Sequence, residues 1–230
     1  MEQQASKKLS PDRPGVDQQL QFASRLATSP IASRLGSEVS GFALATAVSL
    51  DGRTASLRPL TPADYDDWRA LRTSNQERLG APGDGRADFE QRCEIQDMAR
   101  EVGLALTYGV FTGGELVGEI GAEGYGALSG NAGVYAWIDQ DHLGQGLVCE
   151  AFVLLCRAAF EQAGLHRLEA AVLASNDAVR RSLEKVGVRD EGVAREYAEV
   201  NGVWQDHHRY AITATEWGER GDQLIADWVA

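Results

Sequence analysis

Apolar residues recur in this chain with the period of a strand in some stretches and of a helix in others. The first strand pattern covers residues 42–50 and runs into Asp51-Gly52, a pair typical of two-residue hairpin turns. Strand patterns follow at residues 104–111, 115–123, 132–139, 167–173 and 194–212, the last folded back on itself at Asn201-Gly202. The pattern predicts a sheet in which most neighbouring strands are antiparallel.

Helical patterns separate these strands. One opens at "TPADYDDW", where Thr61 is the predicted cap, Pro62 lies in the first turn and Asp64 can complete a capping box. In a later pattern Glu150 falls on the polar face of a helix whose other face would pack on the sheet. The later predicted helices cover residues 86–103, 147–164 and 175–187. The order of elements indicates a mixed α/β domain in which an antiparallel part precedes a parallel crossover.

The chain length predicts one domain with appendages, since 230 residues with 43% hydrophobic residues suffice for a single sizeable core. We expect residues 1–53 to form an N-terminal extension with a short helix and an added strand, residues 54–217 the main domain, and residues 218–230 a C-terminal tail. No stretch approaches the ~20 apolar residues of a membrane span, and the N-terminus lacks an apolar signal core. The sequence therefore predicts a cytoplasmic protein without membrane contact.

The net charge of −12 lies almost entirely in one part of the chain. Residues 1–57 carry six basic and five acidic residues, a charge of +1, so the remainder carries −13. This acidic body argues against a nucleic-acid partner and fits a cationic one, such as a basic polypeptide or a polyamine, although many soluble proteins are equally acidic. Three cysteines match neither a disulfide framework nor a paired metal motif, so we expect reduced thiols and no metal site.

The most informative motif is "DQDHLGQGLVCEA" at residues 139–151, which places Gly144 and Gly146 between a predicted strand and a predicted helix. Free amides and the positive end of the helix dipole would meet there, an arrangement suited to an anion such as a diphosphate. A Walker loop is excluded because no Lys-Ser/Thr follows Gly146. A dinucleotide fingerprint is disfavoured because Cys149 stands where its third glycine belongs.

Four segments in order resemble the GNAT superfamily of acyl-CoA-dependent N-acyltransferases, and within it the branch that acetylates the N-termini of ribosomal proteins. They are "LRPLTPADYDDW", "VYAWIDQDHLGQGLVCEAF", "HRLEAAVLASNDAVRRSLEKVGV" and "EGVAREYAEVNGVWQDHHRYAI". The resemblance implies a mixed, mostly antiparallel sheet of six to seven strands, splayed between its fourth and fifth strands and flanked by about four helices. It also implies acetyl-CoA as the acyl donor, and therefore coenzyme A as a product.

The resemblance assigns the coenzyme site. The loop amides would hold the pyrophosphate, the strand backbone before the loop would bind the pantetheine arm, and an asparagine at the head of the next helix would bind the same arm, unless it serves only as a helix cap. These positions are Gly144, Gln145, Gly146, Leu147, Val148 and Cys149 for the pyrophosphate, Trp137, Ile138 and Asp139 for the strand, and Asn176 for the helix.

Four positions depart from the family pattern. In the loop, Val148 stands where relatives usually have Gly or Ala, and Leu143 where they often have Gln or Arg. In the later helix, Val179 stands where this branch often has Ser, and Leu183 where many relatives have the Tyr that protonates the leaving thiolate. Protonation would then fall to water, to the product ammonium, or to another tyrosine, for which Tyr125, Tyr135 and Tyr197 are the candidates.

A carboxylate is expected to accept the proton of the attacking amine. The sequence favours Glu196 over Glu119, Glu123 and Glu199, because "REY" stands where the family has an "RE" near its acceptor site. The pair His207-His208 cannot form one metal site, since neighbours on a strand point to opposite faces, and His207 is a weaker candidate for the acceptor groove.

The predicted activity is direct transfer of an acetyl group from acetyl-CoA to a primary amine, most specifically the N-terminal α-amine of a protein or peptide. Two alternatives remain open at this stage: acetylation of a small amine such as a polyamine or an aminated antibiotic, and a catalytically silent acyl-CoA-binding module. The N-terminal extension would cover the acceptor groove or a partner in a homodimer.

Overall fold

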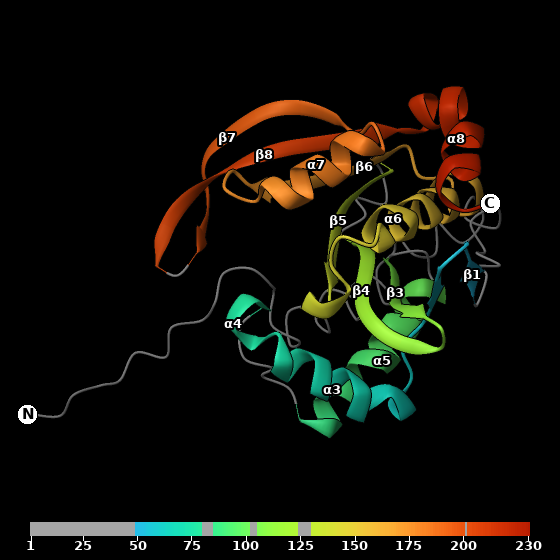
Figure 1. Cartoon of the computed structure of the whole chain (residues 1–230), viewed down its shortest axis with the longest axis vertical. Coiled ribbons are helices and arrows are strands. Elements are labelled where there is room, and N and C mark those ends of the chain that lie inside the picture. Colours follow the sequence, from blue (N-terminus) through green and yellow to red (C-terminus); the bar gives the residue numbers. More distant parts are fainter. Residues whose placement is uncertain (1–48, 80–84, 102–104, 124–129, 201) are drawn as a thin grey trace, which may run out of the picture.

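One eight-stranded sheet forms the centre of the molecule (Figure 1). The computed structural model describes residues 49–79, 85–101, 105–123, 130–200 and 202–230. The sheet order is β1-β2-β3-β4-β5-β6-β8-β7, with β1 (Leu50–Asp51), β2 (Ala55–Arg58), β3 (Ala105–Thr112), β4 (Glu115–Glu123), β5 (Asn131–Ile138), β6 (Arg167–Leu173), β7 (Arg189–Val200) and β8 (Val203–Thr213). All neighbours are antiparallel except β5 and β6, which confirms the predicted mixed sheet.

The sheet has one strand more than the six to seven expected. The additional strand is β1, whose two residues pair with Leu57 and Ser56 of β2 at the edge of the sheet. It was predicted separately, as the strand that the N-terminal extension adds. The rest of that extension, including the short helix and the strand pattern of residues 42–48, lies outside the described residues.

Helices cover both faces of the sheet (Figure 1). On one face α3 (Tyr65–Ser74) and α5 (Arg86–Glu101) build a smaller core around Trp68 and Phe89, and the short α4 (Gln76–Leu79) follows α3. On the other face α6 (Leu147–Arg157), α7 (Asp177–Lys185) and α8 (Ala214–Trp228) bury the larger core. The structure therefore has two helices, α4 and α8, in addition to the four that were expected. No helix of the described residues is both long and apolar enough to cross a bilayer.

The predicted splay of the sheet lies between β5 and β6. The two strands pair only over their first residues, from Asn131 with Arg167 to Gly133 with Glu169. Beyond this point they separate, so residues 134–138 pair with no described strand on the β6 side. The backbone of β5 beyond Gly133 therefore has an unpaired edge on the side of β6, and Figure 1 shows the two strands diverging.

The cap of the first helix is as predicted. The Asp64 carboxylate accepts hydrogen bonds from the Thr61 amide and hydroxyl, both at 2.8 Å, and Arg58 binds the same carboxylate through both terminal nitrogens. Burial alone would raise the pKa of Asp64, but these donors lower it to about 2.

The C-terminal segment also has a defined place, since Trp217 and Leu224 of α8 belong to the larger core.

The first hairpin differs from its prediction. Asp51 is the last residue of β1, and the turn falls at Arg53-Thr54, closed by a 2.9 Å hydrogen bond from the Gly52 amide to the Ala55 carbonyl. Glu150 explains the shift, because its carboxylate accepts hydrogen bonds from the amides of Thr54 (2.8 Å) and Ala55 (3.0 Å). Glu150 is only 5% exposed, so its assignment to a polar helix face was wrong.

We expect Glu150→Ala to lower the free energy of unfolding by about 1–3 kcal/mol, because it leaves two backbone amides without an acceptor in a dry site. Urea denaturation measures the change. Glu219→Ala, at an exposed position of α8, is the matched control and should change stability by less than about 0.5 kcal/mol. Equal stability of the two variants would show that the buried carboxylate contributes nothing to the fold.

Candidate active site

The glycine loop connects the end of β5 to α6. After Ile138 the chain makes one 3-10 turn (Gln140–His142) and then reaches Gly144 and Gly146, with φ of 78° and 83°. L-residues with a side chain rarely adopt such angles, which explains the two glycines. Gly146 caps α6, and the helix begins at Leu147 as predicted.

Five consecutive amides of this loop are available to a ligand. The backbone amides of residues 144–148 donate to no acceptor among the described residues, whereas the Cys149 amide donates to the Gly146 carbonyl at 3.0 Å. The predicted anion site thus comprises Gly144, Gln145, Gly146, Leu147 and Val148, with the dipole of α6 adding positive potential. Cys149 closes the first turn of the helix with its amide already used.

A hydrogen-bond network fixes the approach to this loop. The Asp139 carboxylate accepts from the Asn75 side-chain amide and lies 3.1 Å from Nδ1 of His142. Burial raises the pKa of Asp139, but the hydrogen bonds from Asn75 and His142 outweigh it and the net pKa is lowered. Arg78 donates both to Asn75 Oδ1 and to the Ile138 carbonyl. The helix pair α3–α4 therefore holds the end of β5 in place.

The edge of β5 offers backbone groups to the gap at alternate residues. The Asp139 amide donates to the Val117 carbonyl at 2.7 Å, so this amide and the backbone groups of Trp137 point toward β4. Those of Ala136 and Ile138 point the other way, toward β6, and the Ile138 carbonyl is bound there by Arg78. Of the three predicted strand residues, only Ile138 thus turns its backbone toward the gap. Ala136, which was not predicted, does so as well.

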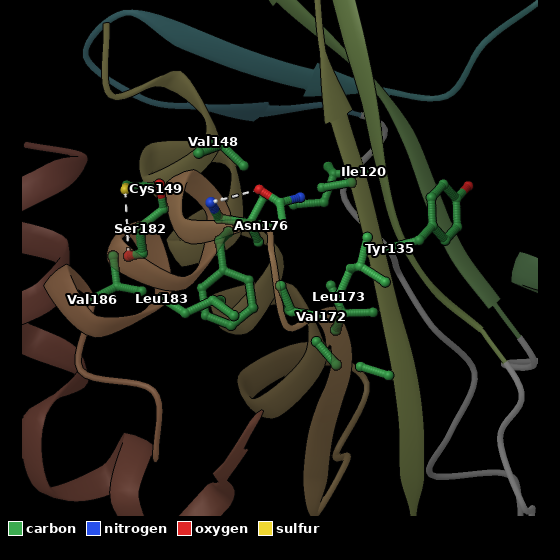
Figure 2. Close-up of a pocket in the computed structure, with 16 residues that line it drawn as sticks. Ile120, Tyr135, Val148, Cys149, Val172, Leu173, Asn176, Ser182, Leu183 and Val186 are labelled. Atoms are coloured by element: carbon green, nitrogen blue, oxygen red, sulfur yellow. Dashed lines mark hydrogen bonds between the residues drawn. The ribbon is translucent and has the colours of Figure 1, made fainter. Parts of the chain in front are cut away.

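The gap leads into a cavity of about 270 Å³ between β5, β6, α6 and α7, which we call the splay cavity (Figure 2). Its walls are mostly apolar. Val148, Val179 and Leu183 all line it, so three of the four departures from the family pattern fall on the same cavity. Cys149 lines it too, with its thiol 3.7 Å from the Ser182 carbonyl (Figure 2). Burial raises the pKa of the Cys149 thiol, which therefore stays protonated and is a poor nucleophile.

Asn176 lines the splay cavity and serves as the helix cap that was predicted as one of its two alternative roles. Its Oδ1 accepts from the Val179 amide at 3.2 Å and caps α7. Its Nδ2 points away from the helix toward β5 (Figure 2) and donates to no described residue. The cap fixes the side chain in an orientation that presents the amide hydrogens to a ligand.

A second cavity, of about 390 Å³, lies on the opposite face of the sheet, where β5, β6, β7 and β8 meet; we call it the outer cavity. It is lined by polar and aromatic side chains, including Tyr135, Tyr197 and His207. Glu169 at its wall is paired with Arg209 (3.1 Å). Figure 2 shows Tyr135 on the far side of β5 from the other labelled residues, as expected for a side chain of the outer cavity.

The two cavities meet at the splay. Val134, Tyr135 and Ala171 line both of them, the first two from β5 and the third from β6. The two cavities therefore adjoin each other at the gap between the strands.

The predicted base candidates line neither of these two cavities. Glu119 is buried and bound by Trp68 and by Arg92 (3.1 Å). Glu196 lies in a bulge of β7 with a φ of 45°, its amide bound to Asp206 and its side chain exposed. Its catalytic role stays a prediction, as do those of the half-buried Glu123 and Glu199. Of the predicted acids, Tyr135 and Tyr197 line the outer cavity, and Tyr125 lies outside the described residues.

Several residues of the site were missed or undervalued. Asn75 and Arg78 showed no sequence signal, because their partners lie about 60 residues away in the chain. Ala136 was passed over in favour of its neighbours, although alternation along a strand could have singled it out once the pairing of one residue was known.

Comparison with known proteins identifies the family. The family described as "Acetyltransferase (GNAT) domain" matches residues 55–189. The chain belongs to the GNAT acetyltransferases. One GNAT relative, named Probable N-acetyltransferase YjcK, from Bacillus subtilis (strain 168), is 33% identical over 174 residues, which cover 71% of this chain and 96% of the relative.

Two further GNAT proteins belong to the predicted branch. The [Ribosomal protein uS5]-alanine N-acetyltransferase of Escherichia coli (strain K12) is 31% identical over 80 residues, 35% of this chain and 41% of that enzyme. The structure of Mycobacterium smegmatis RimJ in complex with CoA-disulfide matches with a TM-score of 0.67 at 27% identity, covering 75% of this chain and 88% of RimJ. The predicted family, its ribosomal-protein acetyltransferase-like branch and the GNAT fold are confirmed.

Proposed function

We propose that this acetyltransferase moves an acetyl group from acetyl-CoA directly to the N-terminal α-amine of a protein or peptide. The observation that carries the proposal is the junction of the splay cavity and the outer cavity at Val134, Tyr135 and Ala171. Two adjoining cavities would let donor and acceptor bind separately and meet between the strands, so the reaction would need alignment and no covalent enzyme intermediate.

The donor side fits coenzyme A in its chemistry. The five free amides of residues 144–148 suit the pyrophosphate, the apolar splay cavity suits the pantetheine arm, and Asn176 Nδ2 can donate to an amide carbonyl of that arm. The Ala136 amide, turned toward the gap, is the donor placed to stabilise the oxyanion that forms on the thioester carbonyl. The structure of RimJ was solved with a CoA-disulfide, which supports the same ligand here.

The lining of the outer cavity favours the end of a polypeptide as the acceptor. The outer cavity is open, is lined by aromatic rings and has its one lining carboxylate among the described residues, Glu169, paired with arginines. Such walls suit the end of a polypeptide better than a polyamine, for which unpaired carboxylates would be needed. The uS5-alanine acetyltransferase acts on a protein by its name, which supports the same acceptor class, and we place the reaction in the cytoplasm, where new proteins are made.

Calorimetry with acetyl-CoA, followed by thiol release with a panel of amines, tests the proposal. We expect saturable binding, and turnover with short peptides that begin with a free alanine. Turnover with spermidine or an aminoglycoside alone would establish the small-molecule alternative. Coenzyme binding without turnover on any amine would establish a silent module. If neither CoA nor acetyl-CoA bound, the whole proposal would be contradicted.

A further inference from the structure

His207 stands in the wall of the outer cavity with its tautomer fixed. Only 8% of the residue is exposed, and its Nδ1 lies 3.1 Å from the Gln205 carbonyl oxygen. A carbonyl can only accept, so Nδ1 carries the hydrogen. In the neutral ring the lone pair is then on Nε2, at the far side of the ring from this hydrogen bond.

The Nε2 atom is available and the ring is held still. Nε2 has no hydrogen-bond partner among the described residues, and the ring packs against Tyr197 with 5.2 Å between centroids. His207 therefore has two properties of a general base: an unpartnered lone pair on a residue that lines the outer cavity, and a second nitrogen whose hydrogen bond fixes the ring.

The other charged and titratable groups that line the outer cavity are less suited than His207 to act as a general base. Glu169 of β6 is paired with Arg209 of β8 at 3.1 Å and with Arg167 at 3.4 Å, so its charge is already compensated. The remaining titratable groups among the described lining residues are the phenols of Tyr135 on β5 and Tyr197 on β7, and a protonated phenol offers no basic site at neutral pH. Within this part of the cavity wall, His207 is the group that offers a basic lone pair outside an ion pair.

We propose that His207 Nε2 is the general base of the transfer, an inference that rests on the proposed function. The bond between the amine nitrogen and the acetyl carbon forms, the proton of that nitrogen passes to Nε2, and the bond between carbon and sulfur breaks. The thiolate takes a proton from water, and the imidazolium returns its proton to solvent. No oxidant, metal or covalent enzyme intermediate takes part.

This base predicts the class of amine. An α-amino group has a pKa of about 7.7–8.0 and a lysine-type amine about 10.4, against about 6.5 for an ordinary imidazole. At neutral pH a sizeable fraction of α-amines is already neutral, whereas only about one alkylamine in a thousand is. The outer cavity should therefore prefer a free N-terminus over a lysine side chain or a polyamine.

The test compares His207→Gln with His208→Gln. His208 lies on the opposite face of the same strand, with Nδ1 2.8 Å from Asp190, and serves as the matched control. We expect His207→Gln to lower kcat/KM for an alanine-starting peptide about 100-fold or more. The wild-type kcat/KM should fall at low pH for two reasons, protonation of the enzyme's base (the acid limb of the enzyme) and protonation of the amine. The variant should keep only the fall that comes from the amine. His208→Gln should keep both, and CoA affinity should stay unchanged in the two variants.

The outcomes separate this inference from the function on which it rests. Inactivity of the wild-type enzyme toward every amine would contradict the proposed function itself. An active wild type whose His207→Gln variant keeps the acid limb would overturn the role of His207 alone. If Glu196→Gln instead removes that limb, the base is Glu196. A higher kcat/KM for an Nα-acetylated peptide with a free lysine than for a free N-terminus would also contradict the predicted amine class.

Discussion

Replacing Gly146 by alanine is expected to raise the Kd for acetyl-CoA at least about tenfold. A Cβ at this position would meet nothing closer than a ring carbon of Trp228 at 3.5 Å, so space is available and the backbone decides the outcome. Its φ of 83° would cost an L-residue about 1–2 kcal/mol. The loop can relieve this cost by rotating its peptide units, which would change the directions of the amides of residues 144–148 and weaken their hydrogen bonds to a bound pyrophosphate. Each lost amide contact to a phosphate is worth about 1.5–3 kcal/mol, and 1.4 kcal/mol is tenfold in Kd.

Gly113→Ala is the matched control for Gly146→Ala. Gly113 also has a positive φ, 57°, and a Cβ there would meet no described atom within 4 Å, but it lies in the turn between β3 and β4. The two variants should lose similar stability in urea denaturation, while calorimetry finds weaker coenzyme binding only for Gly146→Ala. Unchanged affinity in Gly146→Ala would show that the pyrophosphate is held elsewhere.

Replacing Ala171 by phenylalanine is expected to lower kcat/KM for a peptide acceptor about 100-fold or more. Ala171 lines both cavities at the place where they meet, and its side chain projects from β6 on the same face as Glu169 of the outer cavity. A ring there would occupy the passage, and a displacement of about 1 Å between reacting groups already costs about 100-fold. The Ala171 side chain projects toward the outer cavity and only borders the splay cavity, so the Kd for CoA should change far less than kcat/KM.

Ala178→Phe controls for the added ring. Ala178 is exposed on α7 and lines neither of the two cavities, so its substitution should preserve both kcat/KM and coenzyme affinity. Steady-state kinetics with the alanine-starting peptide decides between the two variants. Full activity in Ala171→Phe would mean that donor and acceptor do not meet at this junction.

Local features of this fold were readable from the sequence because their causes are local. The Thr61–Asp64 cap, the two glycines with positive φ and the start of α6 after Gly146 each depend on residues within a few positions of one another. The splay of the sheet followed from the family resemblance. The pairing that ends after Gly133 and Glu169 joins strands about 36 residues apart, and no local pattern encodes it.

The site itself was predictable only on its donor side. The loop amides form one continuous motif, whereas the outer cavity takes Tyr135, Glu169, Tyr197 and His207 from four different strands. Glu150 illustrates the same limit, since its partners are backbone amides almost 100 residues earlier, and a carboxylate on a helix normally indicates a solvent-exposed face. His207 was expected to belong to an ordinary strand surface, with only a weaker claim on the acceptor groove, because its burial and its Gln205 hydrogen bond depend on the fold.

A crystal structure with CoA joined through an acetyl linker to the α-amine of an alanine-starting peptide tests the central claim most directly, because one ligand then reports donor and acceptor positions together. We predict that the pyrophosphate lies on the amides of residues 144–148, the pantetheine arm in the splay cavity beside Asn176, and the peptide in the outer cavity with its α-nitrogen next to His207 Nε2. A pantetheine arm outside the splay, or a peptide that leaves the outer cavity empty, would contradict the account.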